Sequence, residues 1–212
     1  MGQATTFNGL LKLIRQDVPG CPNVLVIQHL QQAARKFCEK TEAWREKLPA
    51  INLVVDDVTY TLTPSYDCEI RRILKLWIRT ADDVTNARDG ALQTYDKYEY
   101  EPEGSVLILS DAIKPKTAVT SGLVVKVVLV PYLTTDVDSN AVQGGISPTF
   151  LNSWAEPIVA YAKYTLMLSP KKSWSNPQLA GVFLNECNVG VSRALTEVDG
   201  LKYRNEQSGF GA

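Results

Sequence analysis

Few residues in this sequence have types and spacing that suggest chemistry, and the first are two adjacent carboxylates, Asp56 and Asp57. A pair of carboxylates can act as acid and base or nucleophile, as in glycoside hydrolysis. Adjacent aspartates are also common in tight turns, where their side chains bond to the backbone. Glu69 is a further carboxylate that could take part in such chemistry. We favour the turn, because the sequence identifies no partner carboxylate in space, and we predict no catalytic residue.

A second acidic group, Asp82, Asp83 and Asp89, could bind a cation. It lacks the alternating ligand positions of a calcium loop, so a solvated loop is the better interpretation. The lone histidine, His29, lies beside the apolar stripe of a predicted helix, and one histidine does not define a catalytic triad. The phosphate-loop, dinucleotide and H-E-x-x-H motifs are absent from the sequence. We therefore predict no metal, no cofactor and no enzymatic activity.

The four cysteines, Cys21, Cys38, Cys68 and Cys187, are widely spaced and form no C-x-x-C motif. Metal ligation by thiolates favours closely spaced pairs, which are missing here. Disulfides are also disfavoured in a reducing compartment. The sequence therefore predicts free, buried thiols, as expected for a protein of a cytoplasm.

The composition is that of an ordinary globular protein of 212 residues, 45% hydrophobic and 21% charged. The formal net charge of −1 argues against strong non-specific attraction to nucleic acid. Two short basic spots, residues 114–116 and 170–172, are predicted to be solvated loop charge. The apolar runs are shorter than a membrane span, and the N-terminal residues lack the pattern of a signal peptide.

The N-terminal part of the chain predicts helices. A first helix begins near Phe7, capped by Thr6 or Asn8, and a break with two prolines follows at residues 18–23. The long stretch 23–48 then carries apolar residues at steps of three and four, which predicts one amphipathic helix that ends before Pro49. Its stripe consists of Ile27, Leu30, Ala34, Phe37, Thr41, Trp44 and Leu48.

The middle of the chain alternates apolar and polar residues, which predicts β-strands. Residues 51–55 and 58–62 are predicted to form a hairpin around the two aspartates. Residues 68–79 predict a strand with Leu74, Leu76 and Ile78 on one face and Trp77 on the other. A polar loop, a short strand from residue 105 and a β-branched strand that ends near Pro131 follow.

The C-terminal part predicts helices again, after a link over residues 134–145. Ser147 and Pro148 form a cap followed by proline at the first helical position, and Pro157 predicts a kink. The stretch "SNPQLAG" repeats the cap-then-proline signal and begins a final helix. Its core face consists of Leu179, Phe183, Cys187, Gly190, Ala194 and Val198. Beyond Asp199 the sequence is polar and contains glycine, which predicts an unpacked segment.

These elements predict an α+β protein. About four helices from the two ends of the chain form a bundle, and a small antiparallel β unit is inserted between them. The predicted sections are the N-terminal helices at 1–49, the β insertion at 50–133, the C-terminal helices at 134–199 and a flexible, extended tail at 200–212.

Two stretches of the sequence resemble the bacteriophage head-to-tail adaptor (connector) proteins of the virion neck. The first is "IQHLQQAARKFCEKTEAWREKLPAINLVVDDVTYTL", a long helix with Thr-x-x-Trp followed by a proline and a strand, an acidic turn and "TYTL". The second is "SWSNPQLAGVFLNECNVGVSRA", which is similar to the late Trp-Ser/Asp-Pro-x-Leu-Ala helix start of those proteins. The order of elements between them is similar too, and the resemblance covers roughly residues 5–200.

The resemblance implies a structural protein of the virion neck, assembled in the host cytoplasm. Such adaptors form a ring, expected to have twelve subunits, below the portal protein ring. The ring extends the channel through which genomic DNA passes without sequence-specific binding, and it offers a platform to the tail or nozzle protein. In related proteins the C-terminal segment docks on the portal, which here would involve Leu201, Tyr203, Arg204 and Phe210. Trp77 and Tyr98 are the candidate anchors of the interface between subunits.

Three alternatives stay open at this point. The protein could be a tail terminator or head-completion ring of another symmetry. Less favoured is a cell-wall hydrolase that uses Asp56, Asp57 or Glu69. A nucleic-acid-binding regulator ranks last, because no basic recognition helix is present in the sequence.

Overall fold

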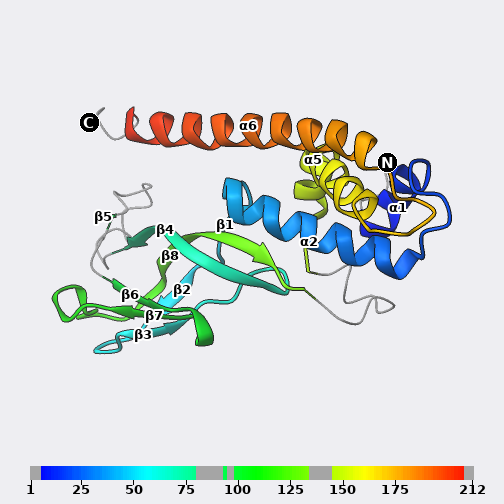
Figure 1. Ribbon diagram of the computed structural model, residues 1–212. Helices are drawn as coiled ribbons and strands as arrows, with labels where there is room; N and C mark the ends of the chain where they lie inside the picture. The colour runs from blue at the N-terminus through cyan, green and yellow to red at the C-terminus, as the bar shows by residue number, and fades with distance from the viewer. Residues whose placement is uncertain (1–5, 80–92, 95–97, 134–144, 208–212) are drawn as a thin grey trace, which may run out of the picture. The chain divides into compact units, whose positions relative to one another are not determined.

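The computed structural model describes residues 6–79, 93–94, 98–133 and 145–207, with residues 201–207 as helical backbone (Figure 1). The chain divides into two compact units. The helical unit combines the residues up to Trp44 with those from Pro131 onward, and the β unit spans Arg45–Val130. Helices thus segregate from antiparallel sheets, which confirms the predicted α+β class.

Helix α1, Phe7–Arg15, begins where the sequence predicts. The Gly9 amide donates a hydrogen bond of 3.2 Å to Thr6 Oγ1, so Thr6 rather than Asn8 is the N-cap. The helix buries Phe7, Leu10 and Ile14, which lie on one face at helical spacing.

Helix α2, Asn23–Thr41, ends earlier than the predicted residue 48. Glu42 adopts the left-handed conformation (φ 52°), and its amide donates to the Cys38 carbonyl at 2.8 Å, which closes the helix. The chain then forms strand β1, Arg45–Lys47, which pairs with residues 126–128. The prediction was wrong because Trp44 and Leu48 are buried outside the helix, and periodicity cannot reveal a strand partner so distant in sequence.

Helix α5, Pro148–Met167, has the predicted cap and the predicted kink. The Phe150 amide donates to Ser147 Oγ at 3.4 Å. Trp154 has non-helical backbone angles (φ −122°, ψ 19°), and Pro157 follows within one turn. Proline has no N–H to offer the carbonyl four residues before it, and its ring crowds that turn, so the helix bends here.

Helix α6, Pro177–Gln207, starts at the predicted cap, where the Leu179 amide donates to Asn176 Oδ1 at 3.1 Å. The predicted core face is largely confirmed, since Phe183, Cys187, Ala194 and Val198 are buried. The helix differs from the prediction at its other end, because its backbone continues past Asp199 to Gln207.

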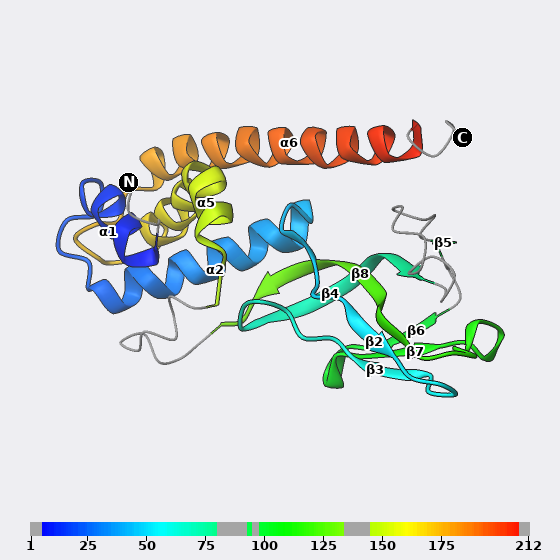
Figure 2. The same cartoon turned by 180° about the vertical axis from the view of Figure 1, so that it is seen from behind.

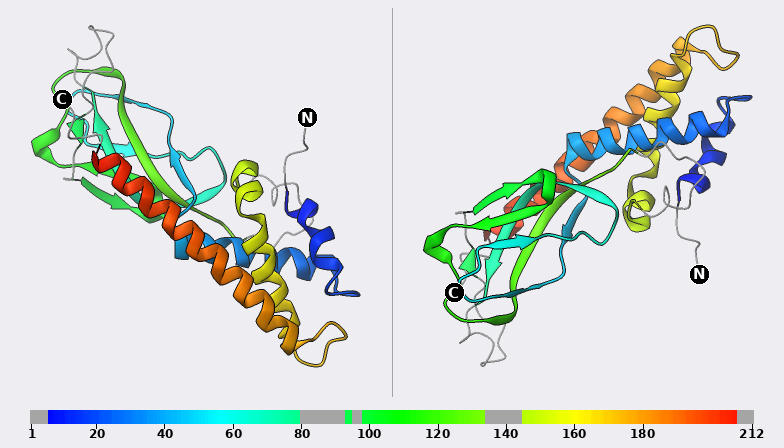
Figure 3. Two further views of the ribbon diagram at one scale, coloured as in Figure 1. Left: turned by 90° about the horizontal axis from the view of Figure 1, so that it is seen from above. Right: turned by 90° about the horizontal axis from the view of Figure 1, so that it is seen from below.

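Aromatic side chains form the centre of the helical unit. The ring centroid of Phe37 in α2 lies 5.4 Å from that of Trp154 and 6.3 Å from that of Phe150. Trp44 stacks on Phe150 with 5.6 Å between ring centroids. Helix α5 packs against α1, α2 and α6, and Figure 3 shows α6 running along α5. These rings connect the N-terminal helix pair with the C-terminal one.

The β unit contains a five-stranded sheet with the order β1-β8-β4-β5, in which β2 also pairs with β8 (Figure 2). Its further strands are β2 (Ile51–Leu53), β4 (Cys68–Ile78), β5 (Gln93–Thr94) and β8 (Val119–Pro131). Strand β8 is buried along most of its length, as expected for an apolar strand in the middle of a sheet. In β4, Leu76 and Ile78 are buried as predicted and Leu74 is half-buried.

A second sheet has the order β3-β7-β6 and consists of β3 (Thr59–Thr61), β6 (Tyr98–Glu101) and β7 (Val106–Leu109). Two short 3-10 helices, Pro102–Gly104 and Asp111–Ile113, flank β7. The predicted hairpin of residues 51–55 with 58–62 is wrong, because β2 pairs with β8 and β3 pairs with β7. Alternation indicates which face a residue occupies, but it does not identify the partner strand.

Candidate functional site

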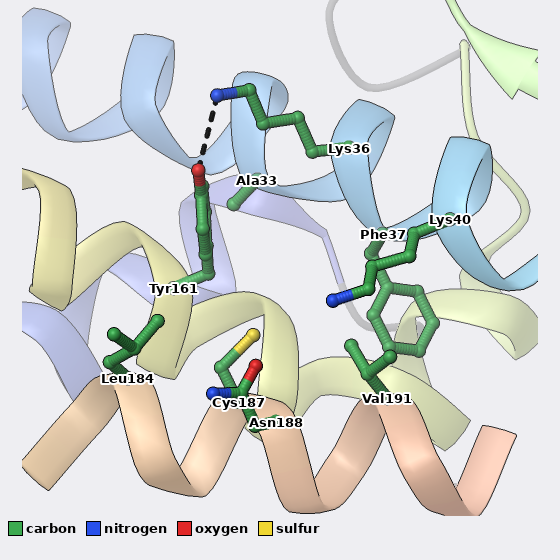
Figure 4. A pocket seen from close by; sticks show the side chains of 9 residues that line it. All are labelled: Ala33, Lys36, Phe37, Lys40, Tyr161, Leu184, Cys187, Asn188 and Val191. Carbon is green, nitrogen blue, oxygen red and sulfur yellow. Dashed lines mark hydrogen bonds between the residues drawn. The ribbon is translucent and has the colours of Figure 1, made fainter. Parts of the chain in front are cut away.

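A groove of about 220 Å³ lies between three helices of the helical unit (Figure 4). Helix α2 contributes Ala33 and Phe37 to its floor, and α6 contributes Leu184, Cys187 and Val191. On each helix these residues are three, four or seven positions apart, so one helical face supplies them. The floor is therefore apolar, and two helices that come from opposite ends of the chain build it.

The rim of the groove is polar and positively charged. Lys36 and Lys40 stand one turn apart on α2, Tyr161 belongs to α5, and Asn188 belongs to α6. Lys36 Nζ donates a hydrogen bond of 3.1 Å to the Tyr161 hydroxyl and lies 5.5 Å from the centre of its ring. This hydrogen bond raises the pKa of the Lys36 amine, which therefore stays charged at neutral pH.

Lys40 and Cys187 face each other across the groove. Figure 4 shows the Lys40 amine reaching from α2 toward the α6 residues Cys187 and Asn188. Burial raises the pKa of the Cys187 thiol, and the positive charge of Lys40 lowers it by a smaller amount. Burial disfavours the charged thiolate, so Cys187 is a protonated thiol at neutral pH. The thiolate is the nucleophilic form of cysteine, so the protonated side chain is a weak nucleophile. Cys187 contributes apolar surface to the groove.

The other three cysteines are buried thiols as well. All four are buried and reduced, which confirms the predicted buried thiols. Burial raises the pKa of Cys21, and it raises that of Cys68 to about 12. These groups pack as small hydrophobic side chains.

A close contact between α5 and α6 fixes the position of the groove residues on α6. A Cβ atom added at Gly190 would lie only 2.4 Å from Pro157 Cβ, closer than two carbon atoms can approach. Glycine has no Cβ and therefore allows the two helices to come this close. Arg193, almost one turn further on, donates to the Ser153 carbonyl at 3.3 Å. That carbonyl is the one that Pro157 leaves without an amide donor. The guanidinium also lies 4.8 Å from the Trp154 ring.

The charge and the apolar floor of this groove are suited to binding. The nine residues that line the groove include two lysines and no carboxylate. Glu39, on the same helix, forms an ion pair of 2.9 Å with Arg35. The groove therefore offers positive charge beside apolar surface, which complements a ligand that carries a carboxylate next to an apolar group.

The predicted docking residues lie near the end of the chain. Leu201, Tyr203 and Arg204 belong to the last turns of α6, which reach Gln207. Phe210 lies outside the described residues. Their assignment to a portal contact stays a prediction.

The predicted interface anchors both lie in the β unit. Trp77 of β4 is half-buried and pairs with Thr94 of β5. The Tyr98 hydroxyl donates to the Ile73 carbonyl at 3.5 Å. Tyr98 also lines a surface hollow of about 600 Å³ together with Glu99 and Asp111. The interface itself stays a prediction.

The aspartate pair occupies a turn, as predicted. Asp56 has positive φ (62°), and its carboxylate lies 3.3 Å from Lys114 Nζ. Asp57 Oδ1 accepts a hydrogen bond of 3.0 Å from the Thr59 amide. Glu69 is half-buried on β4. The group Asp82, Asp83 and Asp89 lies outside the described residues.

We expect Asp57→Ala to lower the free energy of unfolding by about 1 kcal/mol, because it removes the acceptor of the Thr59 amide. Asp57→Asn keeps an acceptor oxygen in the same position and is expected to be nearly neutral. Urea denaturation of both variants measures the difference. An equal loss in both would contradict the turn role and would point to the negative charge instead.

His29 joins α2 to α5 through a hydrogen bond of 2.8 Å between its Nδ1 and Thr165 Oγ1. Thr165 donates its own hydroxyl proton to the Ala162 carbonyl at 3.0 Å, so its oxygen accepts from His29. Burial lowers the pKa of His29 below its ordinary value of 6.5. The folded protein therefore holds this imidazole neutral at neutral pH.

We expect His29 to make the protein less stable as the pH falls below about 6.5. The unfolded chain binds a proton at His29 more readily than the folded chain, so the free energy of unfolding increases with pH in this range. Denaturation midpoints of the wild type and His29→Gln between about pH 7.5 and pH 5.5 test this. A smaller decrease in His29→Gln is the expected result, and equal decreases would contradict it.

No group of three His, Cys, Asp or Glu side chains in the described ranges is placed to hold a metal ion. Among the helices that the structure describes, none is both long and apolar enough to cross a membrane. A scan of known protein-family models and a search of curated proteins find no match to this chain.

Sequence reasoning identified the floor of the groove only as core. The spacing places Cys187 on the core face of the last helix and Phe37 on the stripe of the long helix, whereas Lys36 and Lys40 fall outside that stripe. The available signal was the i, i+4 pair of lysines next to Phe37. The pairing of α2 with α6, which turns these residues into a groove, is tertiary information.

Proposed function

We propose that this protein is a structural head-to-tail adaptor of a bacteriophage virion. It forms a homo-oligomeric ring, expected to have twelve subunits, below the portal. The ring continues the DNA channel and provides the attachment platform for the tail or nozzle protein. The resemblance of the two quoted stretches is the origin of this proposal.

Helix α6 is the observation that carries the proposal. It is capped by Asn176 and buries side chains as far as Val198. Asp199 and Gly200 are exposed, and the helix continues to Gln207. The nine residues after Val198 extend the helix by about 13 Å at 1.5 Å per residue. A helix that is capped at its start and continues past Asp199 to Gln207 is suited to carry a docking segment toward the portal.

The architecture supports the same proposal. Both ends of the chain contribute to one helical unit, and the β unit is inserted between them. We propose that the four helices α1, α2, α5 and α6 form the bundle of the adaptor and that Trp77 and Tyr98 of the β unit contact the next subunit. A closed ring requires such head-to-tail interfaces.

The charge balance is compatible with a DNA channel. The chain carries 22 basic and 23 acidic residues. A strongly basic lining would bind phosphates by counterion release and would slow the movement of DNA. We propose that DNA passes the ring without sequence-specific contacts.

Two truncated proteins test the docking role of the C-terminal segment. One ends after Gln207 and loses Phe210; the other ends after Asp199 and also loses Leu201, Tyr203 and Arg204. Each is mixed with the purified portal ring of the same virus and analysed by sedimentation, with circular dichroism as the folding control. We expect the longer truncation to abolish portal binding while the fold is retained. Unchanged binding by both truncated proteins would contradict the docking segment.

Two of the three alternatives predict other results. A tail terminator or head-completion ring would form its own ring and would not bind the portal. A carboxylate-dependent hydrolase would lose cell-wall hydrolysis in the double variant Asp56→Asn with Asp57→Asn.

A further inference from the structure

The groove between α2, α5 and α6 has an unbalanced charge. Lys36 and Lys40 are exposed at its rim, and none of its lining residues is acidic. Lys36 already contacts Tyr161, which orients its amine beside the groove. The Lys40 amine extends toward α6, and no hydrogen bond or ion pair is found for it among the described residues. Two ammonium groups one turn apart thus remain available to an anion.

The floor below these charges is apolar and small. Phe37, Cys187 and Val191 are buried, while Leu184 is half-buried. The volume of about 220 Å³ is below the ~300 Å³ at which pockets for whole small molecules begin. It is suited to one anchoring side chain of a larger partner, as in the central pockets of protein interfaces.

We propose that this groove binds an acidic segment of a partner protein. One aliphatic or aromatic side chain of the segment occupies the floor between Phe37 and Val191. Neighbouring Asp or Glu carboxylates of the same segment pair with Lys36 and Lys40. This inference goes beyond the adaptor role and does not depend on it.

Charge complementarity selects a peptide over a nucleic acid. A nucleic-acid backbone presents regular phosphates and is bound by extended basic surfaces. Here the positive charge is confined to two lysines beside an apolar floor, and the chain has a net charge of −1. A peptide that carries an acidic residue next to an apolar one complements both the two lysines and the apolar floor, as in the recognition of a helix by a groove.

A defined peptide pool tests the proposal with the full-length protein. The pool contains nine-residue peptides with a central Leu, Ile, Val, Phe or Met between two Asp or Glu residues. The matched control pool has Asn or Gln in the flanking positions. We expect the protein to enrich the acidic pool over the control pool, and we expect added salt to weaken the binding. Equal enrichment of the two pools would overturn the proposal.

Two double variants locate the site. Lys36→Gln with Lys40→Gln removes the positive rim, and Lys171→Gln with Lys172→Gln removes two exposed lysines outside the groove. We expect the first to weaken binding of the best acidic peptide about tenfold, as two partly exposed ion pairs would. The second is expected to leave binding unchanged. All four positions are exposed, so both variants should fold, which circular dichroism verifies.

Two results would overturn the proposal at this stage. One is equal binding by the two double variants. The other is concentration-dependent self-association that the Lys36→Gln, Lys40→Gln variant abolishes, because a second copy of the chain would then be the occupant. Portal binding is measured separately from peptide binding, so the two proposals fail separately. Self-association through the groove would bear on ring assembly, but it would leave the portal-binding result unchanged.

Discussion

Replacing Trp154 with alanine is expected to lower the free energy of unfolding by about 3–5 kcal/mol, the usual cost of removing a large buried aromatic ring. Trp154 is 7% exposed and lies at the kink of α5. Its ring contacts Phe37 of α2 at 5.4 Å and the Arg193 guanidinium of α6 at 4.8 Å. One side chain thus connects three helices, and its loss leaves a cavity between them.

Urea denaturation followed by circular dichroism measures this loss, with Trp154→Phe as the matched control. Phenylalanine keeps a ring against Phe37 and a weaker cation–π contact with Arg193, so less than half of the loss is expected. Similar losses in the two variants would show that the contacts of the indole, rather than the filling of the space, determine stability. A loss below about 1.5 kcal/mol in the alanine variant would contradict the central position of Trp154.

Replacing Gly190 with alanine is expected to destabilise the protein by about 2 kcal/mol, although alanine is the better helix former. The new Cβ would lie 2.4 Å from Pro157 Cβ and 2.9 Å from Pro157 Cγ. The proline ring is rigid and belongs to a helix, so α5 and α6 must separate. Overpacking of this kind costs ~1–3 kcal/mol, and the rigid ring places it at the upper end, against a gain of ~1 kcal/mol in helix propensity.

Gly181→Ala is the matched control on the same helix. Apart from neighbouring residues and the backbone of its own helix, no atom of the described residues lies within 4 Å of a Cβ at Gly181, so only the gain in helix propensity remains. We expect this variant to be more stable than the wild type by up to about 1 kcal/mol. The two substitutions are chemically identical and are expected to have opposite signs in the same denaturation assay. A stabilising Gly190→Ala would contradict the close contact of α5 with α6.

Helix starts were the most predictable part of the fold. The caps at Thr6, Ser147 and Asn176 are local signals, because the capping oxygen and its amide partner lie three residues apart. The kink at Pro157 was predictable for the same reason, since a proline removes a donor from a known turn. Core faces also followed from spacing, as Phe183, Cys187 and Ala194 show.

Long-range pairing was the part that the sequence could not reveal. Residues 45–47 fit the stripe of a long helix, yet they pair with residues 126–128 of β8. Val55 and Tyr60 fit two strands of one hairpin, but β2 and β3 belong to different sheets. In both places the local pattern allowed two structures, and contacts made with β7 and β8 determined which one formed.

The candidate site was predictable only in its parts. Lys36 and Lys40 resembled solvated charge, and Phe37 and Cys187 resembled core. The groove arises where α2 and α6 pack together beside α5, and α6 approaches α5 closely at Gly190 and Pro157. Single-helix periodicity contains no information on this pairing.

Native mass spectrometry of the full-length protein, alone and mixed with the portal ring of the bacteriophage proposed to encode it, tests the proposed adaptor role most directly. The adaptor account predicts one adaptor subunit for each portal subunit, that is, a complex of twelve with twelve. A full-length protein that leaves the portal ring unchanged in mass would contradict the account.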